Sequence, residues 1–223
     1  MSSRSLTLAL DASTYRGTVA VLDGASVLAE ETVAMRGAEV ERLMPAVAAA
    51  IAAVGATPRD LARVVCGAGP GSFTSLRIAG SIAKGMAMAS GAPLHAVSSL
   101  LLVVAGAELP LAAGRYLVLL DAMRDERFAA TVIVGADGAV APDGGAGLVS
   151  REAAASMAAE HGLTCVGPGE QVELWPQARG VARLAGLPHV VPVSLDAWEP
   201  DYGRLAEAQV KWEAAHGRPL PAG

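Results

Sequence analysis

Charged and aromatic residues are scarce in this 223-residue chain. Charged residues make up 17% of it, against about 25% in an average soluble protein, and aromatic residues make up only 4%. Its 17 basic and 22 acidic side chains give a formal net charge of −5, and no run of five basic residues occurs. Because affinity for nucleic acid depends on a basic face, the composition argues against a protein that binds nucleic acid by itself.

Cysteines and long apolar runs are scarce as well. Cys66 and Cys165 lie in apolar, strand-like segments without Cys-x-x-Cys spacing, which predicts reduced, structural thiols. Residues 85–107 carry no charge, but their continuous apolar part spans only 100–105. A membrane-spanning helix needs about 20 such residues, and the first residues lead into a strand-like pattern rather than a signal segment. We therefore expect a cytoplasmic protein without a membrane partner.

Small aliphatic residues and glycines are abundant instead, and their pattern predicts alternating strands and helices. We expect strands at 6–11, 18–22, 26–33, 63–66 and 94–97, and helices at 38–54, 74–90 and 98–108.

A second series of elements begins near the middle of the chain. Residues 116–121 repeat the strand and terminal aspartate of 6–11, and they are followed by a strand at 127–134, a helix at 150–161 and a strand at 164–167. We predict an α/β protein of two lobes with mixed sheets, residues 1–108 and a reduced second copy at 109–223. A C-terminal helix at 205–215 is positioned to fold back over the first lobe.

The end of the first strand carries polar residues that could bind a ligand. In a two-lobed protein, Asp11 and Ser13 would face the crevice and bind Mg²⁺ or phosphate. Alternatively, the two side chains satisfy backbone amides of the turn. Their spacing favours neither interpretation.

A second candidate is the glycine-rich segment 67–74, Gly-Ala-Gly-Pro-Gly-Ser-Phe-Thr, which opens a helix. Glycines allow close backbone approach, and free N–H groups at the start of a helix suit an anion. The lysine of a P-loop is absent, and a tight turn with Ser72 or Thr74 as the helix cap is the alternative. The candidate phosphate-binding residues are Gly69, Gly71, Ser72 and Thr74.

The densest charge cluster follows the second aspartate-ended strand, at 121–127. Its alternating signs indicate either an ion-paired loop at the crevice mouth, with Asp121 and Arg124 as candidate site residues, or a solvated turn. The four histidines are never four residues apart, so the sequence predicts no metal site.

Two helices of the first half are apolar on nearly all sides, which indicates burial beyond the core-facing side. A contact with another chain would explain this pattern, and so would a cover formed by the C-terminal segment of the same chain. The candidate partner-binding residues are Val40, Leu43, Met44, Val47, Ile51, Ile78, Ile82 and Met86.

Together these segments resemble the bacterial TsaB (YeaZ) family. The matching segments are 8–14, 42–45, 67–74 with Arg77 and Gly85, 97–100, 121–126 and 199–202. The resemblance implies an actin-like ATPase (ASKHA) fold of two RNase H-like lobes. It also implies a role in forming N6-threonylcarbamoyladenosine at position 37 of tRNAs that read codons beginning with A.

The resemblance further implies which partners the chain has. In that family the protein is a non-catalytic scaffold of the transferase TsaD, works with the ATPase TsaE, and reaches tRNA through the complex. It also forms homodimers through the same first-lobe helices. ATP or ADP at the crevice or at the complex interface is compatible with such a fold.

The sequence departs from the family pattern at Ser75, where glycine is usual, and at Gly203, where leucine is usual. The alternative function is a small-molecule kinase-like ATPase of the same fold, supported by Asp11, Asp121 and the glycine-rich turn. A reduced second lobe leaves such a kinase little room for an acceptor. The missing His-x-x-x-His pair argues against a metallopeptidase.

Overall fold

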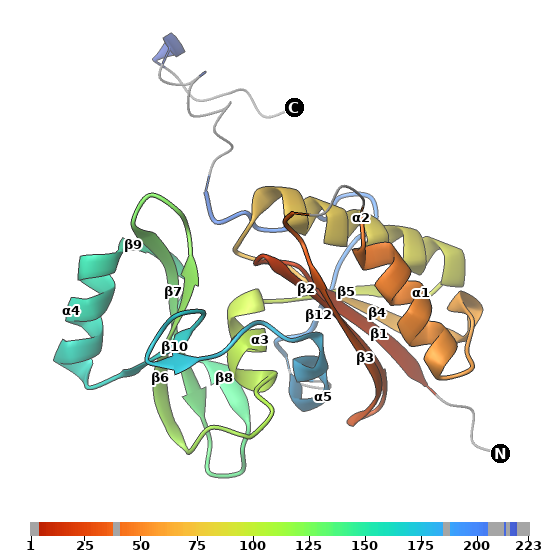
Figure 1. The fold of residues 1–223 in the computed structure, drawn as a ribbon, viewed down its shortest axis with the longest axis horizontal. Coiled ribbons are helices and arrows are strands. Elements are labelled where there is room, and N and C mark those ends of the chain that lie inside the picture. Colours follow the sequence, from red (N-terminus) through yellow and green to blue (C-terminus); the bar gives the residue numbers. More distant parts are fainter. Residues whose placement is uncertain (1–4, 38–40, 185–187, 205–211, 213–214, 218–223) are drawn as a thin grey trace.

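The computed structural model describes residues 5–37, 41–184, 188–204, 212 and 215–217. Figure 1 shows two sheets, each with helices packed on it, joined through a central region. Val40 and most of the predicted C-terminal helix lie outside the described residues.

The described residues of the first half form five strands and three α-helices. They are β1 (Leu6–Asp11), β2 (Arg16–Asp23), β3 (Ser26–Ala34), α1 (Leu43–Ala53), η1 (Pro58–Asp60), β4 (Leu61–Gly67), α2 (Phe73–Ser90), β5 (Leu94–Val97) and α3 (Ser99–Ala105).

The second half has shorter strands. It contains β6 (Gly114–Asp121), β7 (Glu126–Val134), β8 (Val140–Pro142), β9 (Gly147–Ser150), α4 (Arg151–His161), β10 (Thr164–Gly167), β11 (Val172–Glu173), η2 (Ala178–Gly180), α5 (Val181–Leu184) and β12 (Val191–Pro192).

The two sheets have the same internal order. The first runs β12-β5-β4-β1-β2-β3 and the second β11-β10-β6-β7-β8, with β9 pairing to β7. In each, the first strand is antiparallel to the second and parallel to the strand that follows later, β4 or β10. The predicted duplication is therefore present, and the short β10 and β11 show the reduction of the second copy. The structure is an α/β fold of the actin-like type.

Successive side chains of a strand point to opposite faces of the sheet, so the first lobe has one core on each face of its sheet. Leu8 and Leu10 of β1 face α1 and α2, whereas Ala9 faces the other side of the sheet, where α3 lies. All seven residues of α3 are buried, and the same core includes Val118 and Leu120 of β6. Helix α3 is therefore shared by both sheets, as Figure 1 shows. None of the described helices is long and apolar enough to cross a membrane.

The chain returns to the first lobe near its C-terminus. Strand β12 pairs with β5 at the edge of the first sheet. Trp198 and Pro200 then pass over α2, where a Cβ on Gly80 would lie 3.2 Å from the Pro200 ring. One side of α2 is thus covered by the chain's own C-terminal segment, as one of the two interpretations of its apolar surface predicted. The lobe division at 108/109 remains a prediction.

Gly203, one of the two departures from the family pattern, occupies a backbone conformation that favours glycine. Its φ is +69°, and a Cβ there would overlap the Phe128 ring and lie 2.7 Å from Pro70 Cβ. We expect Gly203→Ala to lower the free energy of unfolding by about 2 kcal/mol, because strain and overlap add.

Urea denaturation measures this change, and Gly138→Ala is the matched control. Gly138 has a similar φ of +79°, but nothing lies within 4 Å of its added Cβ. Equal losses in the two variants would show that packing against Phe128 contributes nothing.

Candidate functional site

Asp11 lies at the end of β1 and has no exposed surface. Its Oδ1 accepts hydrogen bonds from the backbone N–H and the hydroxyl of Ser13, at 2.9 and 2.8 Å, and its Oδ2 accepts one from the Ser99 hydroxyl at 2.5 Å. Burial raises the pKa of the Asp11 carboxyl above its usual value, and these hydrogen bonds oppose the rise. Both oxygens are therefore used within the fold, and Ser13 is only 3% exposed.

This geometry corrects the prediction that Asp11 and Ser13 face an open crevice. A carboxylate without solvent access, with hydrogen bonds to both oxygens, cannot contact a nucleotide or Mg²⁺ in this conformation. The alternative interpretation, in which the two side chains satisfy the turn, is the one the hydrogen bonds support.

The glycine-rich turn packs against Asp11 and its neighbours. The N–H of Gly69 donates to the Ser99 hydroxyl at 3.0 Å, and the N–H of Ser72 donates to the Ser13 carbonyl at 2.7 Å. A Cβ on Gly67 would overlap the Asp11 carboxylate, and one on Gly71 would overlap the Ser13 carbonyl. The glycines thus allow three segments to meet.

The same contacts correct the prediction of a phosphate site on this turn. The amides of Gly69 and Ser72 already donate within the protein, so they are not open to an anion. Ser72 stands at the N-cap of α2 but makes no side-chain capping bond; its hydroxyl donates to the Ser75 hydroxyl at 3.1 Å. Thr74 is exposed at the start of the helix.

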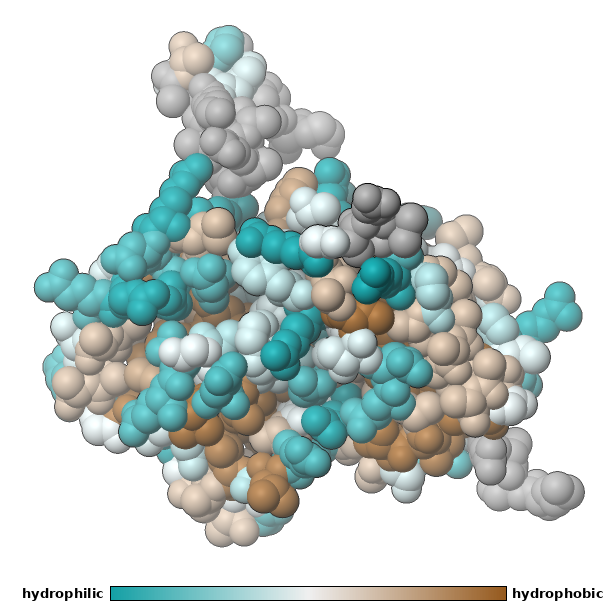
Figure 2. Space-filling model, viewed as in Figure 1, coloured by the Kyte–Doolittle hydropathy of each residue, from teal (hydrophilic) through white to brown (hydrophobic). Residues whose placement is uncertain are grey.

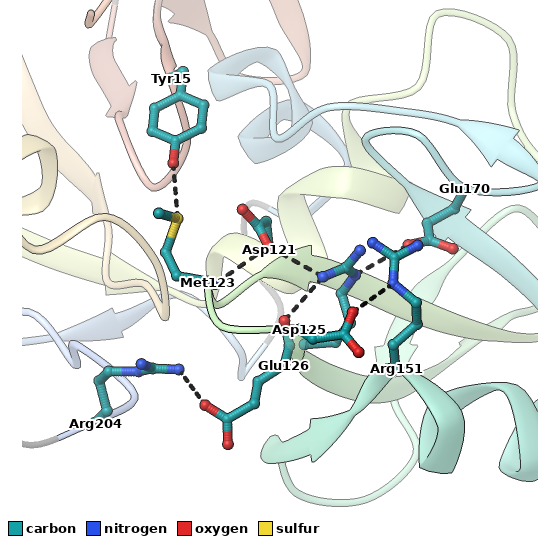
Figure 3. A network of polar contacts seen from close by, with 9 residues as sticks. Tyr15, Asp121, Met123, Asp125, Glu126, Arg151, Glu170 and Arg204 are labelled. Atoms are coloured by element: carbon teal, nitrogen blue, oxygen red, sulfur yellow. Dashed lines mark hydrogen bonds and ion pairs between the residues drawn. The ribbon is translucent and has the colours of Figure 1, made fainter.

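The turn between β6 and β7 is a network of ion pairs, shown in Figure 3. The nearly buried Arg127 donates to Asp121 at 3.1 Å and to Glu170 at 3.4 Å. Two further pairs, Arg151–Asp125 at 3.0 Å and Arg204–Glu126 at 2.8 Å, tie the turn to α4 and to the C-terminal segment. An ion-paired loop is therefore what the structure contains here. Figure 2 shows hydrophilic side chains gathered over this junction of the lobes.

The tip of that turn is exposed and unusual in its backbone. Met123, Arg124 and Asp125 all have positive φ, between 54° and 64°. Such values are uncommon for residues other than glycine. Arg124, a predicted site residue, is therefore held on a tightly turned tip rather than inside a pocket.

Contacts between the lobes lie near the two strand-end aspartates, of which Asp11 is buried and Asp121 is exposed. The Tyr15 hydroxyl donates to Met123 Sδ at 3.2 Å (Figure 3). The Arg16 guanidinium lies 4.1 Å from the Trp175 ring, and the Thr18 hydroxyl accepts a hydrogen bond from Ala178 N–H at 3.0 Å. The structure thus does not bring Asp11 and Asp121 together at one open site.

A cavity of about 390 Å³ lies between the lobes, near the glycine-rich turn. Most of its lining is apolar, from β5, α3 and β7, and Gly69 is the one predicted site residue that the described part of the chain contributes to it. Its ionisable lining residues in the described ranges are His189 and Asp201, with no lysine or arginine. This lining does not suit phosphate groups. Among the described residues, no group of three His, Cys, Asp or Glu could hold a metal ion.

The structure also corrects half of the predicted partner surface. Leu43, Val47, Ile51 and Met86 are at most 4% exposed, because they pack into the core beneath α1 and α2. No partner could touch them without unfolding the lobe. Ile78 and Ile82 are half-buried, and Met44 is 40% exposed.

Two residues outside that prediction mark the outer side of α2. Met88 is 73% exposed. Gly85 lies one turn away, with nothing within 4 Å of an added Cβ. The signal in the sequence was a glycine in the middle of a long helix, where glycine is unfavourable by about 1 kcal/mol relative to alanine.

Comparison with known proteins gives a consistent result. A family model described as TsaD, tRNA N6-adenosine threonylcarbamoyltransferase, matches residues 33–143. Two proteins named tRNA threonylcarbamoyladenosine biosynthesis protein TsaB are similar in sequence. The one from Bacillus subtilis is 38% identical over 93 residues, which is 42% of this chain and 41% of that protein. The one from Escherichia coli is 33% identical over 119 residues, 53% of this chain and 51% of that protein. The chain thus spans about half the length of these relatives.

Solved structures match over more of the chain. A Pseudomonas aeruginosa protein described as similar to peptidase YEAZ superposes with a TM-score of 0.76 at 26% identity, over 90% of this chain and 100% of that one. YeaZ from Pseudomonas aeruginosa shares the fold, with a TM-score of 0.72 at 24% identity, over 89% and 99%. These likenesses and the two-sheet fold agree with the resemblance to the TsaB (YeaZ) family.

Proposed function

We propose that this chain is a non-catalytic subunit in the formation of N6-threonylcarbamoyladenosine at position 37 of tRNAs that read codons beginning with A. The names of its sequence relatives and the matching family model support a role in this modification. In this proposal the chain acts in the cytoplasm as the scaffold of a TsaD-type transferase and works with a TsaE-type ATPase.

The burial and hydrogen bonding of Asp11 support a subunit that is itself non-catalytic. The aspartate at the end of the first strand is fully buried, and both of its oxygens accept hydrogen bonds from Ser13 and Ser99. The kinase-like alternative needs this carboxylate at an open nucleotide site. We therefore place ATP or ADP at the interface of the assembled complex rather than in this chain.

The outer side of α1 and α2 supports the partner role. Gly80 of α2 is explained by the chain itself, because Pro200 packs against it. Gly85 has no such neighbour among the described residues, yet it weakens the helix. Exposed Met88 and Met44 lie on the same pair of helices. A helix of a partner approaching closely over Gly85 would explain this glycine. The same surface could pair two copies of the chain when the transferase is absent.

Reconstitution tests this function. TsaD, TsaE, the adenylate-forming enzyme, threonine, bicarbonate, ATP and unmodified tRNA are combined with and without this chain. We expect the modified adenosine, measured by mass spectrometry of nucleosides, to form only when the chain is present, because a scaffold is required for the transferase to work.

A second arm supplies the chain alone with ATP and small acceptors, and no phosphorylated product is expected. Modification that proceeds equally well without the chain would refute the scaffold role. Phosphorylation by the chain alone would favour the kinase alternative instead.

A further inference from the structure

Three arginines of the first lobe stack on aromatic rings beside the lobe junction. The guanidinium carbon of Arg36 lies 3.4 Å from the centre of the Tyr15 ring. The corresponding distances are 4.1 Å for Arg16 over Trp175 and 4.9 Å for Arg77 over Phe73. We call these six residues the arginine–aromatic edge.

The members of the edge are far apart in the sequence but lie near the same end of the first sheet. Tyr15 and Arg16 follow β1, and the Met35 N–H donates to the Tyr15 carbonyl at 2.8 Å, which places Arg36 beside them. The Ser72–Ser13 hydrogen bond brings the start of α2, with Phe73 and Arg77, to the same end of the sheet. These residues therefore lie near the carboxyl end of β1 and β4, with Arg16 and Trp175 on the η2 side of the first sheet and Phe73 and Arg77 on the α2 side.

The arginines of this edge carry charge that the protein does not neutralise. All three are exposed, and none forms an ion pair within the described part of the chain. Five other arginines form ion pairs with carboxylates at 2.6 to 3.5 Å, namely Arg115, Arg127, Arg151, Arg179 and Arg204. One carboxylate, that of Glu173, approaches the edge, where it accepts a hydrogen bond from the Trp175 indole at 3.3 Å. Among the three arginines, Arg16 therefore contributes least to binding an anion, and Arg36 and Arg77 contribute most.

This combination of groups has a specific chemistry. A guanidinium held over the face of a ring keeps N–H donors available for phosphate oxygens. Aromatic and guanidinium planes also stack on unpaired bases, with little dependence on sequence. A protein partner would need carboxylates to match these charges, whereas RNA offers both phosphates and stacking bases.

We propose that the arginine–aromatic edge binds a single-stranded segment of RNA, such as the loop of a folded RNA. That this RNA is the tRNA of the modification reaction rests on the function proposed above. The net charge of −5 opposes such binding, so the interaction is modest in strength and sensitive to salt. The edge thus positions RNA that the assembled complex holds.

Binding of a fluorescein-labelled hairpin RNA with a single-stranded loop, followed by fluorescence anisotropy at several KCl concentrations, tests the proposal. For the full chain carrying Arg16→Ala, Arg36→Ala and Arg77→Ala together, we expect affinity at low salt to fall about tenfold or more. The slope of log affinity against log salt should fall by about 0.7 for each phosphate that the variant no longer neutralises. Arg36→Lys should keep the salt slope but lose affinity, because it retains charge without the planar stack.

Arg59→Ala is the matched control. Arg59 is exposed in η1, at the opposite end of β4 from the glycine-rich turn, and it contacts no ring in the described structure. The affinity of the Arg59→Ala variant for the RNA should equal that of the unchanged chain. Circular dichroism confirms that each variant is folded.

Absence of RNA binding to the unchanged chain at low salt would overturn the proposal. So would equal losses in the triple variant and in Arg59→Ala, or a triple variant that binds RNA normally but no longer binds the transferase. These outcomes are separate from the function itself. If modification does not require the chain while the RNA still binds at this edge, the proposed function fails and the binding site stands.

Discussion

Asp11→Ala is expected to destabilise the protein by about 3 kcal/mol. The change removes the acceptor of three hydrogen bonds, from the N–H and hydroxyl of Ser13 and the hydroxyl of Ser99. Each donor left unpaired in a buried site costs about 1 kcal/mol or more. Burial raises the pKa of the Asp11 carboxyl, because a desolvated carboxylate is unfavourable. Its removal offsets part of the lost stability. Urea denaturation followed by circular dichroism measures the change.

Asp11→Asn is the matched comparison. Its amide oxygen still accepts the two hydrogen bonds from Ser13, so we expect a loss of only about 1 kcal/mol. If Asp11→Ala unfolds at the same urea concentration as the unchanged protein, Asp11 has no structural role. A role at an open ligand site would then deserve a new test.

Met88→Glu is expected to weaken binding to the transferase about 100-fold while leaving the fold intact. The side chain is 73% exposed, so a charge there costs little in the free subunit. In the proposed contact over Gly85, the same charge would lose its water without gaining a partner. Isothermal titration with purified TsaD measures the affinity, and sedimentation measures any homodimer.

Leu109→Glu provides the control for this prediction. Leu109 is 81% exposed but lies between α3 and β6, away from the outer side of α1 and α2. Unchanged affinity is expected there. If Met88→Glu also binds normally, the partner surface lies elsewhere. Val47→Glu would not be informative, because Val47 is fully buried and the variant would unfold.

Strands with a strong apolar pattern were predicted close to their observed bounds, and short ones were missed. The prediction for 6–11 agrees with β1, and that for 94–97 agrees with β5. Strands β11 and β12 have two residues each, and β8 has three. Such short segments become strands only because a neighbouring strand offers hydrogen-bond partners, and their own residues show no periodicity.

The predicted helix at 38–54 began too early. Helix α1 starts at Leu43, after the Glu41 side chain accepts hydrogen bonds from the Leu43 and Met44 amides. A local hydrogen bond to the backbone, which hydrophobic periodicity cannot register, thus set the start of the helix.

The sequence by itself determined the repeated strand-and-aspartate pattern, the glycine-rich turn and the resemblance to the TsaB (YeaZ) family. These features depend on residues near one another in the chain. The tertiary structure alone decided which sides of the apolar helices face outward and whether Asp11 is open or closed. Pro200 covers Gly80, whereas no residue in the described ranges lies within 4 Å of an added Cβ on Gly85, and Ser99 donates a hydrogen bond to Asp11. Burial depends on segments that are distant in sequence, so the pattern showed that these residues avoid water but not which neighbour excludes it.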